Sequence, residues 1–304
     1  MAASASKIGF VGVGAMGAPM AGCLIKAGYS VAIFDSNPDR AAAFSKEHGI
    51  NPATSLAALG KESDVVITIL PNSAIVHDVL FGDQGLASSL RSGAVVIEMT
   101  SGIPSQTVDF SERLARQGVV LFDAPVSGGV PRARTGELTI MVGGEQADID
   151  AAMPILNVLG SVITTGKVGT GHAMKALNNL VSSAGFLIGI EALIIGSRFG
   201  IDPETMVDVL NASTGMNNST QKKFKQYVLS RKFDSGFAMS LMVKDLTIAL
   251  GIAHENNVNA PFADLCRNLW SGASAILGPQ ADHTAVALLS EQLAGIQISK
   301  HPEQ

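Results

Sequence analysis

The sequence predicts an α/β protein in which an N-terminal Rossmann-type doubly wound domain, residues 1–167, is followed by an all-helical domain, residues 168–304. From Lys7 to Gly166, short runs rich in β-branched residues alternate with alanine-rich segments, which is the pattern of βαβ units around a parallel sheet buried on both faces. From about Gly169 onward the strand-like runs stop, and apolar residues recur with the helical period. The length agrees with two domains, because 304 residues that are 47% hydrophobic exceed what one core usually organises.

The individual elements follow from the same patterns. Strands are expected in the first domain at the runs KIGFVGV, VAIFD, DVVITIL, AVVIEMT, VVLFDAPV, LTIMVGG and VITTG. In the second domain, helices are expected to start at Asp202–Pro203, Asn218 and Asp282, because each position offers a capping side chain. The chain shows no flexible linker near Lys167, so a long helix from about residue 170 is expected to join the domains rigidly.

Composition limits the partners and the compartment. The net charge is −5 without any basic run, so neither nucleic acid nor an anionic membrane is expected as a partner. Cys23 and Cys266 lie far apart without a CxxC motif or a Cys/His cluster, which argues against a disulfide framework and a metal site and favours a reducing compartment. The opening MAASASK has no apolar run, so no secretory signal is expected and the cytoplasm is the expected location.

One segment permits a second interpretation. Residues 176–199 are long and apolar enough to span a bilayer. The same segment carries polar and charged side chains that are costly in lipid, namely Asn178, Asn179, Ser182, Ser183 and Glu191. A buried central helix is therefore favoured over a membrane span.

The first chemical motif is GFVGVGAMGAPMAGCLIKAG, in which three glycines form GxGxxG between a predicted strand and a predicted helix. Glycines at this spacing permit a tight turn, close approach of the backbone to a pyrophosphate and close packing of the helix on the strand. The helix N-terminus adds N–H donors for the phosphates. The residues predicted to bind the cofactor here are Gly12, Val13, Gly14, Ala15, Met16 and Gly17.

The identity of the dinucleotide depends on Asp35, which ends the next strand-like run, VAIFD. A carboxylate there can accept hydrogen bonds from both ribose hydroxyls and would repel a 2′-phosphate, so NAD is favoured over NADP. Arg40, the nearby cation, sits inside the next helix and is the main threat to this preference. The alternative that Asp35 merely caps that helix is weaker, because Ser36 and Asn37 could do so.

The second motif is FDAPVSGGVPRARTGELTIMVGG, residues 122–144. It places Ser127, Gly128 and Gly129 after the carboxyl end of a strand, where open α/β sheets bind ligands. A hydroxyl and unobstructed backbone N–H groups suit a small carboxylate. A plain Ser-Gly-Gly turn explains the same residues equally well, and the sequence leaves both interpretations open.

The third motif, GTGHAMKALNN, places Lys175, Asn178 and Asn179 at i, i+3 and i+4 of a predicted helix, so their side chains share one face. Glycines precede the lysine and an apolar helix follows it, which distinguishes it from an ordinary surface charge. Burial penalises the charged form of a lysine, so such a group can take or return a proton. The asparagines cannot change protonation state and are expected to orient the lysine and a substrate hydroxyl.

Together with LMVKDL at residues 241–246, these motifs resemble the β-hydroxyacid dehydrogenase family, whose members include 3-hydroxyisobutyrate dehydrogenase, tartronate semialdehyde reductase and L-threonate dehydrogenase. The resemblance covers residues 8–246 in order. It implies an NAD-dependent oxidoreductase that interconverts a short 3-hydroxy acid with its semialdehyde or 3-oxo acid. It also implies a homodimer or homotetramer, as does the amount of apolar helix surface in the second domain.

By this resemblance Lys175 matches the catalytic general acid/base, Asn179 the substrate-orienting asparagine, and residues 127–129 the loop for the substrate carboxylate. Lys244 corresponds to a lysine that reaches the cofactor, and Ser101 to a hydroxyl residue near the nicotinamide. The loop ILPNS matches the one flanking the cofactor and contributes Leu70, Pro71 and Asn72. The family commonly shows an aspartate where this chain has Glu98, and serine then threonine where it has Thr100 then Ser101.

The substrate signals disagree. DAPVSGGVPRARTG and NASTGMNNST resemble 3-hydroxyisobutyrate dehydrogenase, whereas ADHTAVALLSEQLAG resembles tartronate semialdehyde reductase. Asn217 and Asn218 favour a hydroxylated substrate if they face the site, although a helix start explains them as well. An imine reductase would have a different residue at Lys175, and a non-catalytic NAD-binding scaffold would not need Lys175, Asn179 and the Ser-Gly-Gly loop together.

Overall fold

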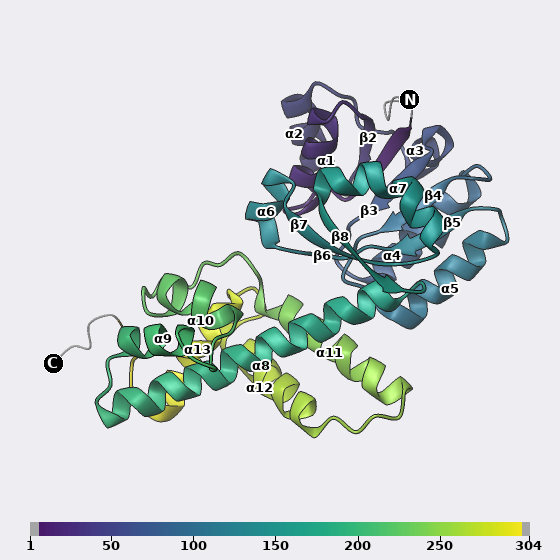
Figure 1. Ribbon diagram of the computed structural model, residues 1–304. Coiled ribbons are helices and arrows are strands. Elements are labelled where there is room, and N and C mark those ends of the chain that lie inside the picture. The colour runs from purple at the N-terminus through teal and green to yellow at the C-terminus, as the bar shows by residue number, and fades with distance from the viewer. Residues whose placement is uncertain (1–5, 300–304) are drawn as a thin grey trace. The chain divides into compact units, whose positions relative to one another are not determined.

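The computed structural model describes residues 6–299, in which the chain forms two units, Met1–Lys175 and Ala176–Gln304 (Figure 1). The opening residues, where no secretory signal is expected, lie largely outside the described range. The fold class expected from the sequence is confirmed, with an α/β unit followed by a helical one. The predicted domain boundary at 167/168 stays a prediction.

The first unit is built on one twisted sheet with the strand order β2-β1-β3-β4-β5-β7-β6, and β8 pairs with β7. Its strands are β1 (Lys7–Val11), β2 (Ser30–Phe34), β3 (Val65–Thr68), β4 (Val95–Glu98), β5 (Val120–Asp123), β6 (Val126–Ser127), β7 (Leu138–Gly143) and β8 (Gly160–Gly166). All the runs predicted to be strands form strands. Because β1 lies between β2 and β3, the topological switch point falls between β1 and β3, and the adjoining carboxyl ends form the usual ligand crevice.

The sheet is parallel only from β1 to β5 and in the β7–β8 pair. The expectation of a parallel sheet is wrong for β7, which runs antiparallel to both β5 and β6. The physical reason is the short connection between Ser127 and Leu138, which holds only the helix α6 (Gly129–Thr135). A parallel crossover needs a dozen or more residues.

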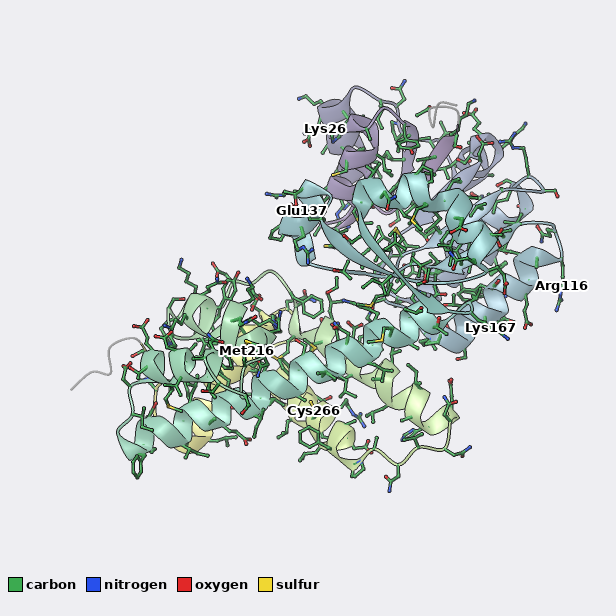
Figure 2. All side chains as sticks on the ribbon, in the orientation of Figure 1. Lys26, Arg116, Glu137, Lys167, Met216 and Cys266 are labelled. Carbon is green, nitrogen blue, oxygen red and sulfur yellow. The ribbon has the colours of Figure 1, made fainter. Side chains whose placement is uncertain are left out.

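Helices cover both faces of the sheet, which explains the continuous apolar strands. Neighbouring strand residues pack into two different cores: Ile67 and Ile97 into one, Val66 and Val96 into the other. The helices of this unit are α1 (Gly17–Lys26), α2 (Pro38–His48), α3 (Leu56–Glu62), α4 (Ser73–Phe81), the 3-10 turn η1 (Leu86–Ser88), α5 (Pro104–Ala115), α6 and α7 (Gln146–Leu159). Charged side chains such as those of Lys26, Arg116, Glu137 and Lys167 are exposed on its surface (Figure 2).

The named secondary-structure elements in the described residues of the second unit are all helices. Its elements are most of α8 (Thr170–Phe199), α9 (Pro203–Asn211), α10 (Asn218–Lys222), the π-helix η2 (Phe224–Val228), α11 (Met239–Glu255), α12 (Pro261–Leu277), the 3-10 turn η3 (His283–Ala285) and α13 (Val286–Ala294). The expected starts at Asp202–Pro203, Asn218 and Asp282 are confirmed. Asp202 and Asp282 cap their helices as expected, whereas α10 is capped by Asn217 and not by Asn218.

Within residues 6–299, α8 is the one helix long and apolar enough to cross a membrane by length and composition. Its residues Phe186, Ile190 and Leu193 are fully buried and form the core of the second unit with Trp270 of α12. Cys266 of α12, labelled in Figure 2, is buried in the same core. This is how the central helix of a packed domain behaves, although only 39% of the most apolar window is buried.

Candidate cofactor and substrate site

The glycine-rich turn lies at the carboxyl end of β1, against the loop that leaves β3. Gly12 has φ +97°, and a Cβ there would lie 2.4 Å from the carbonyl oxygen of Ile69, so only glycine fits. A Cβ at Gly17 would lie 1.8 Å from the carbonyl oxygen of Gly12, because α1 packs directly on the turn. A Cβ at Gly14 would meet nothing within 4 Å. The turn is therefore closed toward the protein at two glycines and open at the third, which fits close approach of a pyrophosphate.

Asp35 lies just beyond β2, and its carboxylate is held by backbone donors. One oxygen accepts a hydrogen bond from the N–H of Val13 at 2.9 Å, and the other accepts one from the N–H of Asn37 at 2.8 Å. Asn37 itself caps α2 by accepting hydrogen bonds from the N–H groups of Asp39 and Arg40. Asp35 is thus tied to the glycine-rich turn, and the helix cap is supplied by another residue.

The loops after β3 and β4 are joined to each other. The N–H of Leu70 donates to Oγ1 of Thr100 at 2.9 Å, and Thr100 is 1% exposed. Asn72 caps α4 by accepting a hydrogen bond from the N–H of Ile75. These loops carry the predicted cofactor residues Leu70, Pro71, Asn72 and Ser101, close to the switch point.

The Ser-Gly-Gly segment lies between β6 and α6. Ser127 is the last residue of β6 and pairs in register with Thr139 of β7. Gly128 and Gly129 have φ values of +133° and +68°, so both occupy backbone conformations that favour glycine. The two glycines carry no side chains of their own, although the side chains of Arg132 and Leu138 lie close to Gly128. The role of this turn as a carboxylate site stays a prediction.

The start of α8 is capped from a distant strand. Asp123, at the end of β5, accepts hydrogen bonds from the N–H of Gly169 at 2.6 Å and from the N–H of His172 at 2.7 Å. These are the N-cap and N3 positions of the helix, the two donors that a capping box satisfies. Burial raises the pKa of Asp123, while the neighbouring His172 and the two N–H donors partly offset this rise.

A second buried carboxylate, Glu98 at the end of β4, reaches the same helical turn. Its Oε2 lies 2.9 Å from Nε2 of His172, and both side chains are almost fully buried. Its Oε1 accepts a hydrogen bond from the N–H of Thr100 at 2.8 Å. The other ring nitrogen of His172 lies 2.9 Å from Oγ1 of Thr107 on α5. Lys175 follows His172 by one helical turn on the same helix.

The predicted asparagines lie on the part of α8 that belongs to the second unit. Nδ2 of Asn179 donates to Oδ2 of Asp245 on α11 at 2.5 Å, and Nδ2 of Asn178 donates to Oδ1 of Asn179 at 3.2 Å. Nζ of Lys244 lies 3.5 Å from the other oxygen of Asp245. The predicted residues Asn178, Asn179 and Lys244 therefore form one hydrogen-bonded cluster around a buried aspartate. Whether Lys244 contacts the cofactor stays a prediction.

Four polar residues of this arrangement are not among the predicted site residues: Glu98, Asp123, His172 and Asp245. Each is at most 2% exposed. The sequence signal that could have identified them is an acid or a histidine embedded in an apolar run, as in AVVIEMT and LMVKDL. Such groups are buried only when they are paired, so each one indicates an unseen partner.

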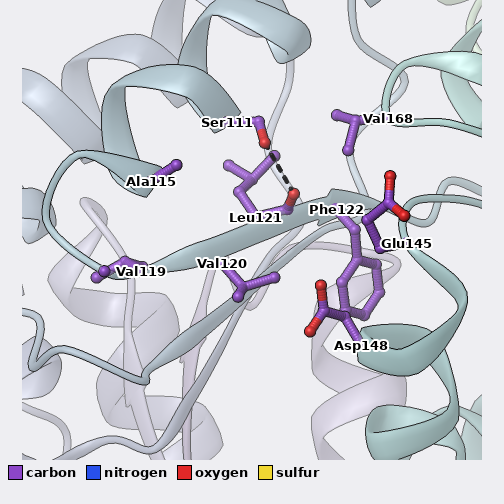
Figure 3. Close-up of a pocket in the computed structure, with 10 residues that line it drawn as sticks. Ser111, Ala115, Val119, Val120, Leu121, Phe122, Glu145, Asp148 and Val168 are labelled. Carbon is purple, nitrogen blue, oxygen red and sulfur yellow. Dashed lines mark hydrogen bonds between the residues drawn. The ribbon is translucent and has the colours of Figure 1, made fainter.

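A separate cavity of about 290 Å³ lies in the first unit between α5, β5 and the start of α7 (Figure 3). Apolar side chains such as Val120 and Phe122 line it, with the carboxylates of Glu145 and Asp148 at one side. None of the predicted site residues lines it. Across residues 6–299, no group of three or more His, Cys, Asp or Glu side chains is placed to hold a metal ion.

Comparison with known proteins identifies the family. A family model described as the NAD-binding domain of 6-phosphogluconate dehydrogenase matches residues 7–169. A second, described as NAD-binding of NADP-dependent 3-hydroxyisobutyrate dehydrogenase, matches residues 169–290. The 2-(hydroxymethyl)glutarate dehydrogenase of Eubacterium barkeri is 36% identical over 294 residues, which cover 96% of this chain and 97% of that protein. The chain belongs to the β-hydroxyacid dehydrogenase family.

Other members share its sequence and fold. The mitochondrial 3-hydroxyisobutyrate dehydrogenase of Mus musculus is 36% identical over 254 residues, covering 81% of this chain and 76% of that protein. The solved structure of Mycobacterium tuberculosis 3-hydroxyisobutyrate dehydrogenase with L-serine has a TM-score of 0.87 at 28% identity, covering 94% of this chain and 99% of that one. An imine reductase from Myxococcus stipitatus has a TM-score of 0.64 at 19% identity, which shows a shared fold alone.

This β-hydroxyacid dehydrogenase is therefore an oxidoreductase that acts on the CH–OH group of a small hydroxy acid. Its first unit is the NAD-binding domain, as the glycine-rich turn predicts. The family assignment is confirmed, and so is a nicotinamide dinucleotide as the cofactor, while the preference for NAD over NADP stays a prediction. The roles predicted for individual site residues stay predictions.

Proposed function

We propose that the protein oxidises the hydroxyl of a short 3-hydroxy acid with NAD, and that Lys175 is the general base in this direction and the general acid in reverse. The observation that supports this role is the placement of Lys175 on a helical turn fixed by two buried carboxylates, Asp123 and Glu98. Because the backbone of this turn is fixed, the lysine side chain leaves the helix at a defined point, which favours the repeated geometry that proton transfer to a substrate hydroxyl requires.

The residues of the first unit fit a dinucleotide. The open side of the turn at Gly14 would receive the pyrophosphate, and Asp35 would accept hydrogen bonds from the ribose hydroxyls. When bound, the nicotinamide accepts a hydride from the alcohol carbon. Asp35 would face the 2′-phosphate of NADP with a like charge, so NAD is the proposed cofactor.

Residues of the chain itself would transfer the proton and bind the substrate. Neutral Lys175 would take the hydroxyl proton as the carbonyl forms, and the resulting ammonium would return it in the reverse direction. Asn179, one turn further along α8, has its amide fixed by Asp245 and would orient the substrate hydroxyl. Ser127 and the N–H groups of Gly128 and Gly129 would bind the substrate carboxylate.

The substrate class follows from what the named relatives share. 3-Hydroxyisobutyrate and 2-(hydroxymethyl)glutarate both carry a CH₂OH group on the carbon next to a carboxylate. We propose a 2-(hydroxymethyl) carboxylate of this kind, most like 3-hydroxyisobutyrate. Glycerate, the product expected of a tartronate semialdehyde reductase, and L-threonate are the competing substrates.

The proposed role of Lys175 is tested with purified protein. A panel of 3-hydroxyisobutyrate, 2-(hydroxymethyl)glutarate, glycerate and L-threonate is assayed by NADH formation, first with wild type. With the best substrate, Lys175→Ala should lower kcat by roughly a hundredfold or more, while NADH affinity stays within about twofold. The exposed Lys167 offers a matched control, and Lys167→Ala should retain wild-type kcat. Normal turnover by Lys175→Ala would refute the role.

The assembly is proposed to be a homodimer or homotetramer, formed through apolar helix faces of the second unit. On α8, Val181, Ile188 and Ile195 recur every seven residues and are 58–73% exposed. On α12, a second exposed stripe comprises Phe262, Leu265, Leu269 and Ile276. Stripes of this kind mark interaction surfaces, because monomers rarely expose them.

Light scattering at micromolar concentration should give a multiple of 31.4 kDa. Leu265→Lys on the α12 stripe should weaken the assembly, while the same change at an exposed polar position of another helix should not. A single species of 31.4 kDa in wild type would exclude this proposal.

The composition of the chain also supports the cytoplasm as its location.

A further inference from the structure

The first turn of α8 is weak by its own sequence. Gly169 and Gly171 flank Thr170, and glycine is the residue with the greatest backbone freedom. The first N–H groups of any helix lack partners within the helix. Without external constraints, this first turn, which precedes Lys175, would be prone to fraying.

Two carboxylates from the sheet constrain this turn in different ways. Asp123 binds backbone N–H groups, so it fixes where the helix begins along its axis. Glu98 meets the His172 side chain at Nε2 while Thr107 meets the same ring at Nδ1. These contacts, from β4 at Nε2 and from α5 at Nδ1, restrict the rotation of the ring about its side-chain bonds. The His172 contacts therefore fix the rotation of the helix about its axis.

The same carboxylate also holds the loop on the cofactor side. Oε1 of Glu98 accepts a hydrogen bond from the N–H of Thr100, whose hydroxyl accepts one from the N–H of Leu70. The next glycine, Gly102, has so little room that a Cβ would lie 3.1 Å from the His172 ring. Glu98 is thus shared between the loop predicted to flank the nicotinamide and the helix that carries Lys175.

We infer that Glu98 and His172 are positioning residues for the reaction, which set the orientation of Lys175 relative to the loop at Thr100 and Ser101. This inference rests on the proposed function of Lys175. His172 lies three residues before Lys175, so on a helix the two side chains project from neighbouring positions one turn apart. A rotation of the first turn would displace the Lys175 amine directly.

The test compares kcat, KM, NADH affinity and melting temperature for a set of variants. His172→Leu removes both ring contacts and should lower kcat at least about tenfold, because displacement of a catalytic group by an ångström or so is enough for such losses. KM and the NADH dissociation constant should change by less than about threefold. His172→Gln retains an amide N–H that can donate to Glu98 and should recover most of the lost kcat.

Thr107→Val keeps the shape of the side chain but removes the Nδ1 contact, and it should lower kcat by a few fold in a folded protein. His283→Gln provides a matched control, since it also removes a buried histidine but one that belongs to the core of the second unit. It should lower the melting temperature and leave kcat near wild type. Equal losses of kcat in the His172 and His283 variants would show a general effect of destabilisation and overturn the inference.

A double-mutant cycle separates this inference from the proposed function. If His172 acts through Lys175, adding His172→Leu to Lys175→Ala should cause little further loss of kcat, because the residues act as a unit. If Lys175→Ala retains turnover, the proposed function fails. If Lys175→Ala loses turnover while folded His172→Leu stays within twofold of wild type, only the positioning role fails.

Discussion

The same substitution at two glycines of the GxGxxG turn should have opposite consequences. Gly14→Ala places its Cβ in open space, with nothing within 4 Å. Gly17→Ala places its Cβ 1.8 Å from the carbonyl oxygen of Gly12 and 2.9 Å from Cγ2 of Ile69. The first change should leave the fold intact and impair cofactor binding, whereas the second should damage the fold.

The magnitudes follow from these contacts. Non-bonded heavy atoms rest at about 3.5–4.0 Å, so Gly17→Ala forces α1 and the turn apart by more than about 1 Å. Overpacking of a well-packed site costs about 1–3 kcal/mol, and a fixed backbone oxygen places this case at the upper end. The roughly 1 kcal/mol that alanine gains over glycine in a helix offsets only part of this cost.

Gly14→Ala should be neutral or slightly stabilising, by up to about 1 kcal/mol, because alanine restricts the unfolded chain. If the pyrophosphate approaches the backbone at Gly14, the added methyl group should raise the NADH dissociation constant at least about tenfold, or roughly 1.4 kcal/mol. Urea unfolding without cofactor measures the stabilities, and fluorescence titration measures NADH affinity. Wild-type affinity in Gly14→Ala would show that the dinucleotide does not approach the open side of the turn.

Two further predictions concern a cofactor contact and a buried histidine. The 2′-phosphate of NADP would place a like charge about 4 Å from Asp35, which costs roughly 4 kcal/mol at an effective dielectric of 20. Wild type should therefore prefer NAD to NADP at least tenfold in kcat/KM, and Asp35→Ser should relax this preference. Equal use of both cofactors by wild type would contradict the prediction. Burial, and then the charge of Lys223, lowers the pKa of His283 to about 4, so the unfolded chain binds this proton more readily. The free energy of unfolding should thus be undiminished above about pH 6.5 and should fall by about 3 kcal/mol toward pH 4. Urea unfolding across this range should show a smaller fall for His283→Phe than for wild type. An equal fall in the variant would exclude His283 as the source of the pH dependence.

The elements that the sequence predicts correctly are those whose signals are local. Asp202 precedes a proline and caps its own helix, and the strand-like runs carry their β-branched residues within a few positions. The reversed direction of β7 is harder to predict, because a run of β-branched residues looks the same in either direction. Only the length of the connection after Ser127 carries that information.

In the candidate site, too, contacts within a local motif are predicted from the sequence and contacts between distant residues are not. The glycine turn and Asp35 belong to a contiguous motif, so spacing alone predicts their proximity. Asn179 and Asp245 are separated by 66 positions, and Glu98 and Thr68 by 30, so these pairs exist only once the fold has formed. A single sequence shows that a buried acid needs a partner but does not say which residue supplies it.

The start of α8 also depends on a partner that is distant in sequence. The segment KVGTGHAMK has a glycine at the N-cap, where a local capping residue would normally accept a hydrogen bond from the N3 N–H. Asp123 performs that task from 49 positions earlier in the chain, and it also binds the N–H of Gly169. Because the cap belongs to the sheet, the first turn of the helix is stabilised by the folded NAD-binding unit. If Lys175 is the general base that we propose, its orientation depends on these contacts from the sheet edge, and substitutions at Asp123, Glu98 or Thr107 should change the reaction without contacting the substrate.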